Sequence, residues 1–237
     1  MSPDRRDFLR ISSATFATIA FGACGSRGPE KAAALLDFAE RKNEGVERLL
    51  FRHTSMDHAR ADATPSGDKF PAYFVSDTVP TWDVAAKGAW RLEVGGMVKR
   101  PLSLSLEDLM KLERRTQRVN HYCVEGWTAV ADFTGVSMRE LARVAEADPA
   151  AGYVDFQSFD DDYHESWDAE SALHPQTLVV YAKDGAALTP RYGAPARVHS
   201  PVKLGYKNTK YLTKIVFLPK KNGGYWSDRG YEWYGGL

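Results

Sequence analysis

The stretch Val119-Asn120-His121-Tyr122-Cys123-Val124-Glu125-Gly126-Trp127 holds one of only two cysteines in the 237-residue chain. The β-branched and polar residues from Thr116 to Tyr122 predict a β-strand, and Gly126 predicts a sharp turn directly after it. His121 and Tyr122 should point to opposite faces of that strand. Cys123 is therefore expected where a strand ends, which is where α/β and α+β folds commonly place their ligands.

The chemistry of Cys123 depends on its lack of a partner. The other cysteine, Cys24, ends an N-terminal segment with the layout of an export signal, so an exported protein would keep Cys123 alone. A lone thiol is a buried packing residue, an intermolecular link or a working sulfur, and free cysteine is among the most buried residue types. Without a CxxC partner, one thiolate does not make a zinc or iron–sulfur site, but it suits a soft or highly charged transition metal that has other ligands.

A second motif lies downstream of the cysteine and carries a family resemblance. It reads Gly193-Ala194-Pro195-Ala196-Arg197, then Pro201, then Gly205-Tyr206-Lys207-Asn208-Thr209-Lys210. Together with Cys123 to Trp127, it resembles the molybdopterin-dependent oxidoreductases of the sulfite oxidase superfamily. Within that superfamily it is most similar to the periplasmic branch that includes methionine-sulfoxide reductase catalytic subunits. The resemblance runs from about Phe70 to the C-terminus.

The resemblance implies an α+β, sulfite-oxidase-like fold with a mixed β-sheet, built around a molybdenum-molybdopterin cofactor. It makes Cys123 the catalytic residue and the single protein ligand to molybdenum. The cofactor-binding residues that it implies are Cys123, Ser76, Asp77, Ser158, Tyr192, Arg197, Asn208, Thr209 and Lys210. Arg197 and the segment Asn208-Thr209-Lys210 would hold the pterin phosphate, which needs fixed cations and backbone donors.

Two segments depart from the family pattern. Tyr192 stands where relatives tend to have histidine or asparagine, and Phe74 to Thr78 stands where sulfite oxidases have an arginine-asparagine-histidine run. For the basic residues there is also a simpler interpretation, because runs of charge are usually solvated. In that case Lys203, Lys207, Lys210 and Lys214 would form one cationic surface.

The implied activity is oxygen-atom transfer, with reduction of a small-molecule or protein sulfoxide as the expected reaction. The asparagine-arginine-arginine pattern of true sulfite oxidases does not follow Cys123, which disfavours sulfite as the substrate. Sulfite-oxidase-like oxidation and a non-catalytic periplasmic binding or scaffold protein are the alternatives. No CxxCH haem motif occurs, so electrons should come from a separate haem partner, either a membrane haem b protein or a c-type cytochrome. A net charge of zero gives no reason to expect nucleic acid as a partner.

The N-terminal residues predict export. A charged start, Asp4 to Arg10, precedes weakly apolar residues from Ile11 to Ala23, and Arg5-Arg6 with Phe8-Leu9 resembles a twin-arginine signal. The alternative is an amphipathic helix. Residues 1–24 are thus expected to be a signal peptide that delivers folded protein to the periplasm. Phe21-Gly22-Ala23-Cys24 partly resembles a lipoprotein cleavage box, so lipid anchoring at Cys24 is a further alternative.

The remaining chain divides into residues 25–66, a helix and linker, and residues 67–237, the oxidoreductase domain. The helix should run from Pro29 to about Leu50 and break near Gly45. In the domain, strands are predicted at residues 90–94, 153–159, 177–182, 196–200 and 213–218, and helices should begin after Ser105 and Ser137. Asp160 to Asp162 with His164 could bind a hard cation or form a solvated loop.

Overall fold

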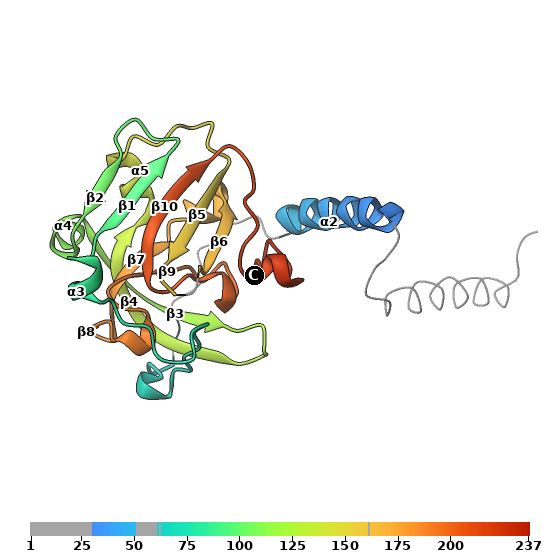
Figure 1. Cartoon of the computed structure of the whole chain (residues 1–237). Coiled ribbons are helices and arrows are strands. Elements are labelled where there is room, and N and C mark those ends of the chain that lie inside the picture. Colours follow the sequence, from blue (N-terminus) through green and yellow to red (C-terminus); the bar gives the residue numbers. More distant parts are fainter. Residues whose placement is uncertain (1–29, 51–60, 62, 161) are drawn as a thin grey trace, which may run out of the picture. The chain divides into compact units, whose positions relative to one another are not determined.

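The structure, a computed structural model, describes residues 30–50, 61, 63–160 and 162–237 (Figure 1). The predicted signal peptide, with Arg5, Arg6 and Cys24, lies outside the described residues. The chain divides into two compact units, residues 1–50 and residues 51–237. In the described residues, no helix combines the length and the apolar character that a membrane span requires.

The described residues of the first unit form the helix α2 (Glu30–Leu50). The helix is continuous through Gly45, so the predicted break is wrong. A glycine inside a helix costs only about 1 kcal/mol relative to alanine. Side-chain pairs one turn apart span the glycine and offset part of this cost: Asn43 donates to Glu47 at 2.9 Å and Arg48 donates to Glu44 at 2.7 Å.

The second unit contains a mixed five-stranded sheet in the order β2-β1-β10-β5-β6 (Figure 1). Its strands are β1 (Leu92–Gly96), β2 (Leu102–Leu104), β5 (Tyr153–Ser158), β6 (His164–Asp168) and β10 (Leu212–Leu218). β1 and β10 pair in parallel, and the other neighbours are antiparallel. The mixed sheet predicted from the sequence is therefore present.

A second sheet, entirely antiparallel among the described strands, carries the cysteine hairpin. Its strands are β3 (Arg114–Tyr122), β4 (Thr128–Ser137), β7 (Leu178–Lys183), β8 (Ala186–Ala187) and β9 (Arg197–His199). Central strand β7 is apolar along most of its length because both of its faces are covered. Val179 belongs to the larger hydrophobic core shared with the mixed sheet, whereas Val180 belongs to a smaller core with Phe70 and Phe133.

Short helices connect the strands. They are η1 (Gly67–Lys69), α3 (Val84–Lys87), α4 (Leu106–Lys111), α5 (Met138–Val144), α6 (Ala169–Ala172), η2 (Pro190–Tyr192), η3 (Gly205–Lys207) and η4 (Ser227–Arg229). The predicted cap at Ser105 is a complete capping box with Asp108. At Ser137 only half of the box forms, because the Glu140 side chain pairs with Arg143 instead.

Four of the described strands were missed by the sequence analysis: the short strands β2 and β8 and the longer strands β4 and β6. The residues of β4 look like an exit from β3 rather than a strand, because apolar residues occur on both of its faces and Gly135 interrupts it. β6 has the sequence His-Glu-Ser-Trp-Asp, which lacks an apolar alternation, yet Glu165, Ser166 and Asp168 are all buried. Ala61, which precedes position 67, also bonds to the second sheet, because its amide donates to the Arg118 carbonyl at 3.1 Å. The domain boundaries stay a prediction.

Candidate active site

Cys123 lies in the turn between β3, which ends at Tyr122, and β4. The Cys123 amide donates to the Trp127 carbonyl at 3.0 Å, and the Gly126 amide donates to the Cys123 carbonyl at 3.0 Å. Gly126 has φ 87°, a left-handed conformation that favours glycine. The predicted strand end at Cys123 is therefore present. The thiol is only partly buried, which disagrees with the alternative of a fully buried packing cysteine.

A cavity of about 370 Å³ opens beside Cys123. This volume falls within the usual range of about 300–1,000 Å³ for ligand pockets. Of the residues predicted to bind a cofactor, Cys123, Ser158, Tyr192, Arg197, Asn208 and Lys210 line it. These residues come from the β3–β4 turn, β5, η2, β9 and the segment after η3, so the fold brings the two sequence motifs to one place.

Arg197 and Lys210 place two cations in the cavity wall. Arg197 is 4% exposed, and among the described residues its guanidinium donates to the carbonyls of Tyr192, Val198 and Asn208. In the part of the chain that the structure describes, no carboxylate forms an ion pair with either residue. Burial lowers the pKa of Arg197 to about 10. Burial, followed by the charge of Arg197, lowers the pKa of Lys210 to about 7. Two poorly solvated cations side by side favour an anionic ligand.

The other lysines of this region do not form the solvated surface that was the alternative. Lys203 and Lys207 are buried and pair with Asp168 at 3.2 Å and with Glu165 at 2.5 Å. Lys214 is exposed on β10. The simpler interpretation is therefore wrong for Lys203 and Lys207, which have internal carboxylate partners.

Three predicted residues do not line the cavity: Ser76, Asp77 and Thr209. Asp77 is exposed, and the buried Thr209 hydroxyl has no hydrogen-bond partner among the described residues. Ser76 is held by Asp160, whose carboxylate accepts from the amides of Val75 at 2.9 Å and of Ser76 at 3.0 Å. Through these bonds Asp160 fixes Val75, which does line the cavity.

Asp160 thus differs from both sequence-based interpretations of the acidic run. It is 3% exposed and its oxygens are used by backbone amides and by the Ser76 hydroxyl, so it is neither solvated nor free for a cation. Within the described ranges, no cluster of three or more histidine, cysteine or acidic side chains could hold a metal ion. His164 instead bonds to Asp155 at 2.9 Å, which raises its pKa.

A buried histidine pair lies behind the cysteine turn. His121 lines the cavity, and its Nδ1 atom lies 3.2 Å from Nε2 of His199, which stacks on Phe133. Burial, followed by the charge of Arg197, lowers the pKa of His121 to about 3. The pKa of His199 is also lowered by burial. Gly205 leaves space over the outer edge of His121, because a Cβ atom there would lie 2.8 Å from Nε2.

Comparison with known proteins identifies the family. The oxidoreductase molybdopterin binding domain matches residues 77–226, more than half of the chain. The chain belongs to this family. It is therefore a molybdopterin-binding oxidoreductase that uses the molybdenum cofactor, as the two sequence motifs predicted. Because members of this family are oxidoreductases, the alternative of a non-catalytic binding or scaffold protein is disfavoured.

Several relatives of this oxidoreductase carry related names. A putative protein-methionine-sulfoxide reductase subunit YedZ1 of Azospira oryzae is 36% identical over 99% of this chain and 88% of its own length. The protein-methionine-sulfoxide reductase catalytic subunit MsrP of Ralstonia nicotianae is 32% identical over 62% of this chain. That match spans 49% of the Ralstonia protein. MsrP of Xanthomonas axonopodis pv. citri is 29% identical over 98% of this chain and 75% of its own length.

Among solved structures, the sulfane dehydrogenase SoxCD from Paracoccus pantotrophus is similar in fold. The TM-score is 0.54 at 20% identity, covering 59% of this chain and 40% of that chain. At this identity the likeness supports the fold alone. It agrees with the α+β, sulfite-oxidase-like fold predicted from the sequence.

The cavity of the oxidoreductase has the donors that a molybdopterin needs. The Cys123 thiol is a soft metal ligand, and Arg197 and Lys210 are cations that form no ion pair with a carboxylate among the described residues. The one buried carboxylate of the lining, Asp160, is already bonded to the amides of Val75 and Ser76. The unpartnered Thr209 hydroxyl and the buried Tyr211 hydroxyl, which also has no partner among the described residues, lie in or next to the phosphate motif. The residues present are therefore of the kinds that fit the cofactor, a soft sulfur ligand together with cations.

Many lining residues were not found from the sequence. They include the segment Phe70 to Val75, Trp127, Asp160, Tyr163, Tyr206, Tyr211, Trp226 and Tyr231. Most are aromatic, and an aromatic residue in a sequence gives no sign of whether it lines a cavity or fills a core. Only Trp127 and Tyr206 stand inside the motifs that carried the family resemblance.

Proposed function

We propose that this oxidoreductase is an exported reductase of sulfoxides, acting on methionine sulfoxide or a related small or protein-bound sulfoxide. One observation carries the proposal: Cys123, Arg197 and Lys210 line the same cavity. The names of the relatives, protein-methionine-sulfoxide reductase subunits, support the choice of substrate class.

Cys123 is proposed as the protein ligand to molybdenum. Its sulfur is held at a rigid turn by the two backbone hydrogen bonds of residues 123–127, which fix its position before any ligand binds. When bound, the molybdenum cofactor supplies exchange of an oxygen atom and two electrons with the substrate. In the holoenzyme, Cys123 would thus hold the cofactor at a fixed place in the cavity.

Arg197 and Lys210 are proposed to bind the phosphate of the pterin. The guanidinium is fixed by three backbone carbonyls, so it is preorganised for an anion. Ser158, Tyr192 and Asn208 line the same cavity and are proposed as further contacts. Ser76, Asp77 and Thr209 stay predicted contacts, and of these Thr209 has the buried unpartnered hydroxyl that a ligand could satisfy.

The surroundings of Cys123 favour a neutral sulfoxide over anionic sulfite. The Glu125 carboxylate lies 3.9 Å from the Cys123 sulfur and accepts from the Trp127 indole at 3.1 Å. A carboxylate beside the thiol repels an anion. Arg197, the arginine that lines the cavity, is assigned to the phosphate. Sulfite oxidation therefore remains the second candidate, because the described lining of the cavity offers sulfite no further arginine beside Cys123.

The reaction also needs protons. Reduction of a sulfoxide to a thioether and water consumes two protons and two electrons. The cavity reaches solvent beside Cys123 at the exposed Glu125, so water can supply the protons from that side. The aromatic residues around it restrict water access to the inner part of the cavity.

The partner and location belong to the same proposal. The electrons would come from a separate haem protein, either a membrane haem b protein or a c-type cytochrome. The twin-arginine motif supports folded export to the periplasm. Changing Arg5 and Arg6 together to Lys should leave the protein in the cytoplasm, because this export route reads the guanidinium pair rather than charge alone. Normal export of that variant would reject the twin-arginine route.

The substrate assignment is tested with purified holoenzyme. Reduction by a dithionite-reduced dye is measured with methionine sulfoxide, an oxidised protein and dimethyl sulfoxide, and oxidation of sulfite is measured with a c-type cytochrome or ferricyanide. We expect turnover of the sulfoxides and a much lower rate with sulfite. Preference for sulfite would reject the proposal in favour of the second candidate.

A further inference from the structure

The C-terminal segment from Gly223 to Leu237, here called the C-terminal strap, contributes side chains to the cavity. Most of this segment follows the residues that the family model matches. The family match ends at residue 226. Trp226 and Tyr231, both in the C-terminal strap, line the cavity together with Cys123. The C-terminal strap is therefore a place where this protein can differ from other members in what it accepts.

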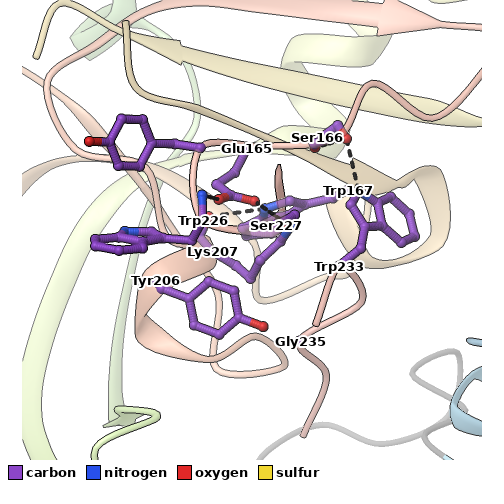
Figure 2. Close-up of polar contacts among 12 residues, drawn as sticks. Glu165, Ser166, Trp167, Tyr206, Lys207, Trp226, Ser227, Trp233 and Gly235 are labelled. Carbon is purple, nitrogen blue, oxygen red and sulfur yellow. Dashed lines mark hydrogen bonds and ion pairs between the residues drawn. The ribbon is translucent and has the colours of Figure 1, made fainter. Parts of the chain in front are cut away.

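A buried charge network anchors the beginning of the C-terminal strap (Figure 2). The Glu165 carboxylate accepts from Lys207 Nζ at 2.5 Å, from the Trp226 amide at 3.0 Å and from the Ser227 hydroxyl at 3.2 Å. Glu165 and Lys207 side chains are both 0% exposed. Figure 2 shows the Lys207 and Ser227 side chains meeting the Glu165 carboxylate, with the Tyr206 ring below them. A buried charge that is fully bonded holds its partners in one arrangement, so Trp226 has a fixed position.

A second set of contacts anchors the end of the C-terminal strap. Lys203 Nζ donates to the Tyr234 carbonyl at 2.6 Å and lies 3.6 Å from the Tyr234 ring centre. The Leu204 amide donates to the Gly235 carbonyl at 2.9 Å. Between the two anchors, Tyr231 is 41% exposed. A large aromatic side chain that is fixed at both flanks and still exposed is available to a ligand.

Tyr206, Trp226 and Tyr231, here called the aromatic triad, form one surface of the cavity. The Tyr231 ring centre lies 5.4 Å from that of Tyr206 and 5.1 Å from that of Trp226. The Tyr206 hydroxyl donates to the Glu232 carbonyl at 2.5 Å, so this tyrosine is held by the C-terminal strap and its hydroxyl already has a partner. The aromatic triad thus presents mainly ring surface, which suits carbon and sulfur groups better than ions.

We propose that the aromatic triad determines substrate specificity by binding the carbon groups attached to the substrate sulfur, with Glu165 and Lys207 as positioning residues. The inference rests on the proposed function and goes beyond it, because it assigns side-chain recognition to the C-terminal strap. A substrate gains binding free energy in proportion to the apolar surface that it buries against the rings. A neutral sulfoxide with a large apolar arm, such as methyl phenyl sulfoxide, should therefore depend on the aromatic triad more than dimethyl sulfoxide does.

The test uses holoenzyme of the unaltered protein and of Tyr231→Ala, with Arg229→Ala as the matched control. Arg229 is in the same strap, is exposed and does not line the cavity. Tyr231→Ala should raise KM for methyl phenyl sulfoxide about tenfold and should raise KM for dimethyl sulfoxide far less. Tyr231→Phe keeps the ring and should recover most of this selectivity. Arg229→Ala should leave both constants unchanged.

Two further measurements distinguish a loss of substrate recognition from a loss of structure or cofactor. Molybdenum content per protein should be the same in all four proteins, and quenching of tryptophan fluorescence by the thioether product should weaken in Tyr231→Ala. Equal effects on both substrates in Tyr231→Ala would reject the inference and leave the proposed function in place. Absence of sulfoxide turnover in the unaltered protein would reject the proposed function and this inference with it. If Tyr231→Ala did not fold, the same KM ratio in Trp226→Leu would decide.

Discussion

His121 Nδ1 lies 3.2 Å from His199 Nε2, and both imidazoles are buried. His199 Nδ1 has no hydrogen-bond partner among the described residues. An unpaired buried N–H is rarer in proteins than an unpaired acceptor. We therefore infer that His199 Nε2 carries the proton and donates to His121. His121 then carries its own proton on Nε2, the atom that Gly205 leaves uncovered.

Gly205→Ala tests this close approach. The new Cβ would lie 2.8 Å from His121 Nε2, so the imidazole or the backbone must shift. We expect a loss of about 1–3 kcal/mol in the free energy of unfolding and a lower molybdenum content. Urea unfolding and metal analysis measure the two effects. Gly95→Ala is the control, because nothing lies within 4 Å of a Cβ at that position. Equal behaviour of the two variants would contradict the close packing of Gly205 on His121.

Lys210 should give the cofactor-free protein an unusual pH dependence. The pKa of Lys210 is lowered to about 7 in the folded state from an ordinary value of 10.5. Between these values the unfolded chain binds more protons than the folded one, so the free energy of unfolding should rise as pH increases from 7 toward 10. Bound phosphate should abolish this rise by keeping Lys210 charged in the folded protein.

Urea unfolding at pH 7 and pH 9 measures this effect, with Lys210→Met as the reference because the other titrating groups are common to both proteins. The rise should be smaller in the variant and smaller in holoenzyme than in cofactor-free protein. The same pH dependence in all three would show that Lys210 is an ordinary solvated lysine.

The Glu165–Lys207 pair predicts a large cost for removing one charge. Glu165→Gln leaves Lys207 buried without its carboxylate, which should lower the free energy of unfolding by about 3–5 kcal/mol. Glu140→Gln removes a partner of the exposed Arg143 and should cost less than about 1 kcal/mol. The double variant Glu165→Gln/Lys207→Met should recover much of the loss, because it removes the unpaired charge. A loss in Glu165→Gln as small as that in Glu140→Gln would mean that the pair is not buried as the structure shows.

Much of this fold was predictable because its strands carry local signals. β3 and β10 contain β-branched and apolar residues, and the caps at Ser105 and Ser137 have the expected spacing. β6 was not predictable in the same way. Its buried polar residues are satisfied by partners far along the chain, such as Glu165 by Lys207, 42 residues away. Sequence periodicity reports burial of apolar surface and carries no information on buried polar pairs.

In the candidate site, too, some residues could be predicted from the sequence and others could not. Cys123, Arg197 and Lys210 were found because they stand in motifs, and the cavity brings them together. Tyr231 and Trp226 stand in no motif that carries chemistry, and they become visible only when the C-terminal strap is seen to return to the cavity. Asp160 was read as part of an acidic run, although its role is to bind the backbone of Val75 and Ser76. Such roles depend on tertiary contacts between distant segments.

The central claim, that Cys123 is the protein ligand to molybdenum, is tested most directly by the metal content of Cys123→Ser. A neutral hydroxyl is a much poorer ligand than a thiolate, while the change in volume is small and the side chain is only partly buried. The variant should therefore melt close to the temperature of the cofactor-free unaltered protein, and it should lose most of its molybdenum together with the thiolate-to-metal absorption. A Cys123→Ser protein that keeps full molybdenum content and full sulfoxide reduction per mole would contradict the account.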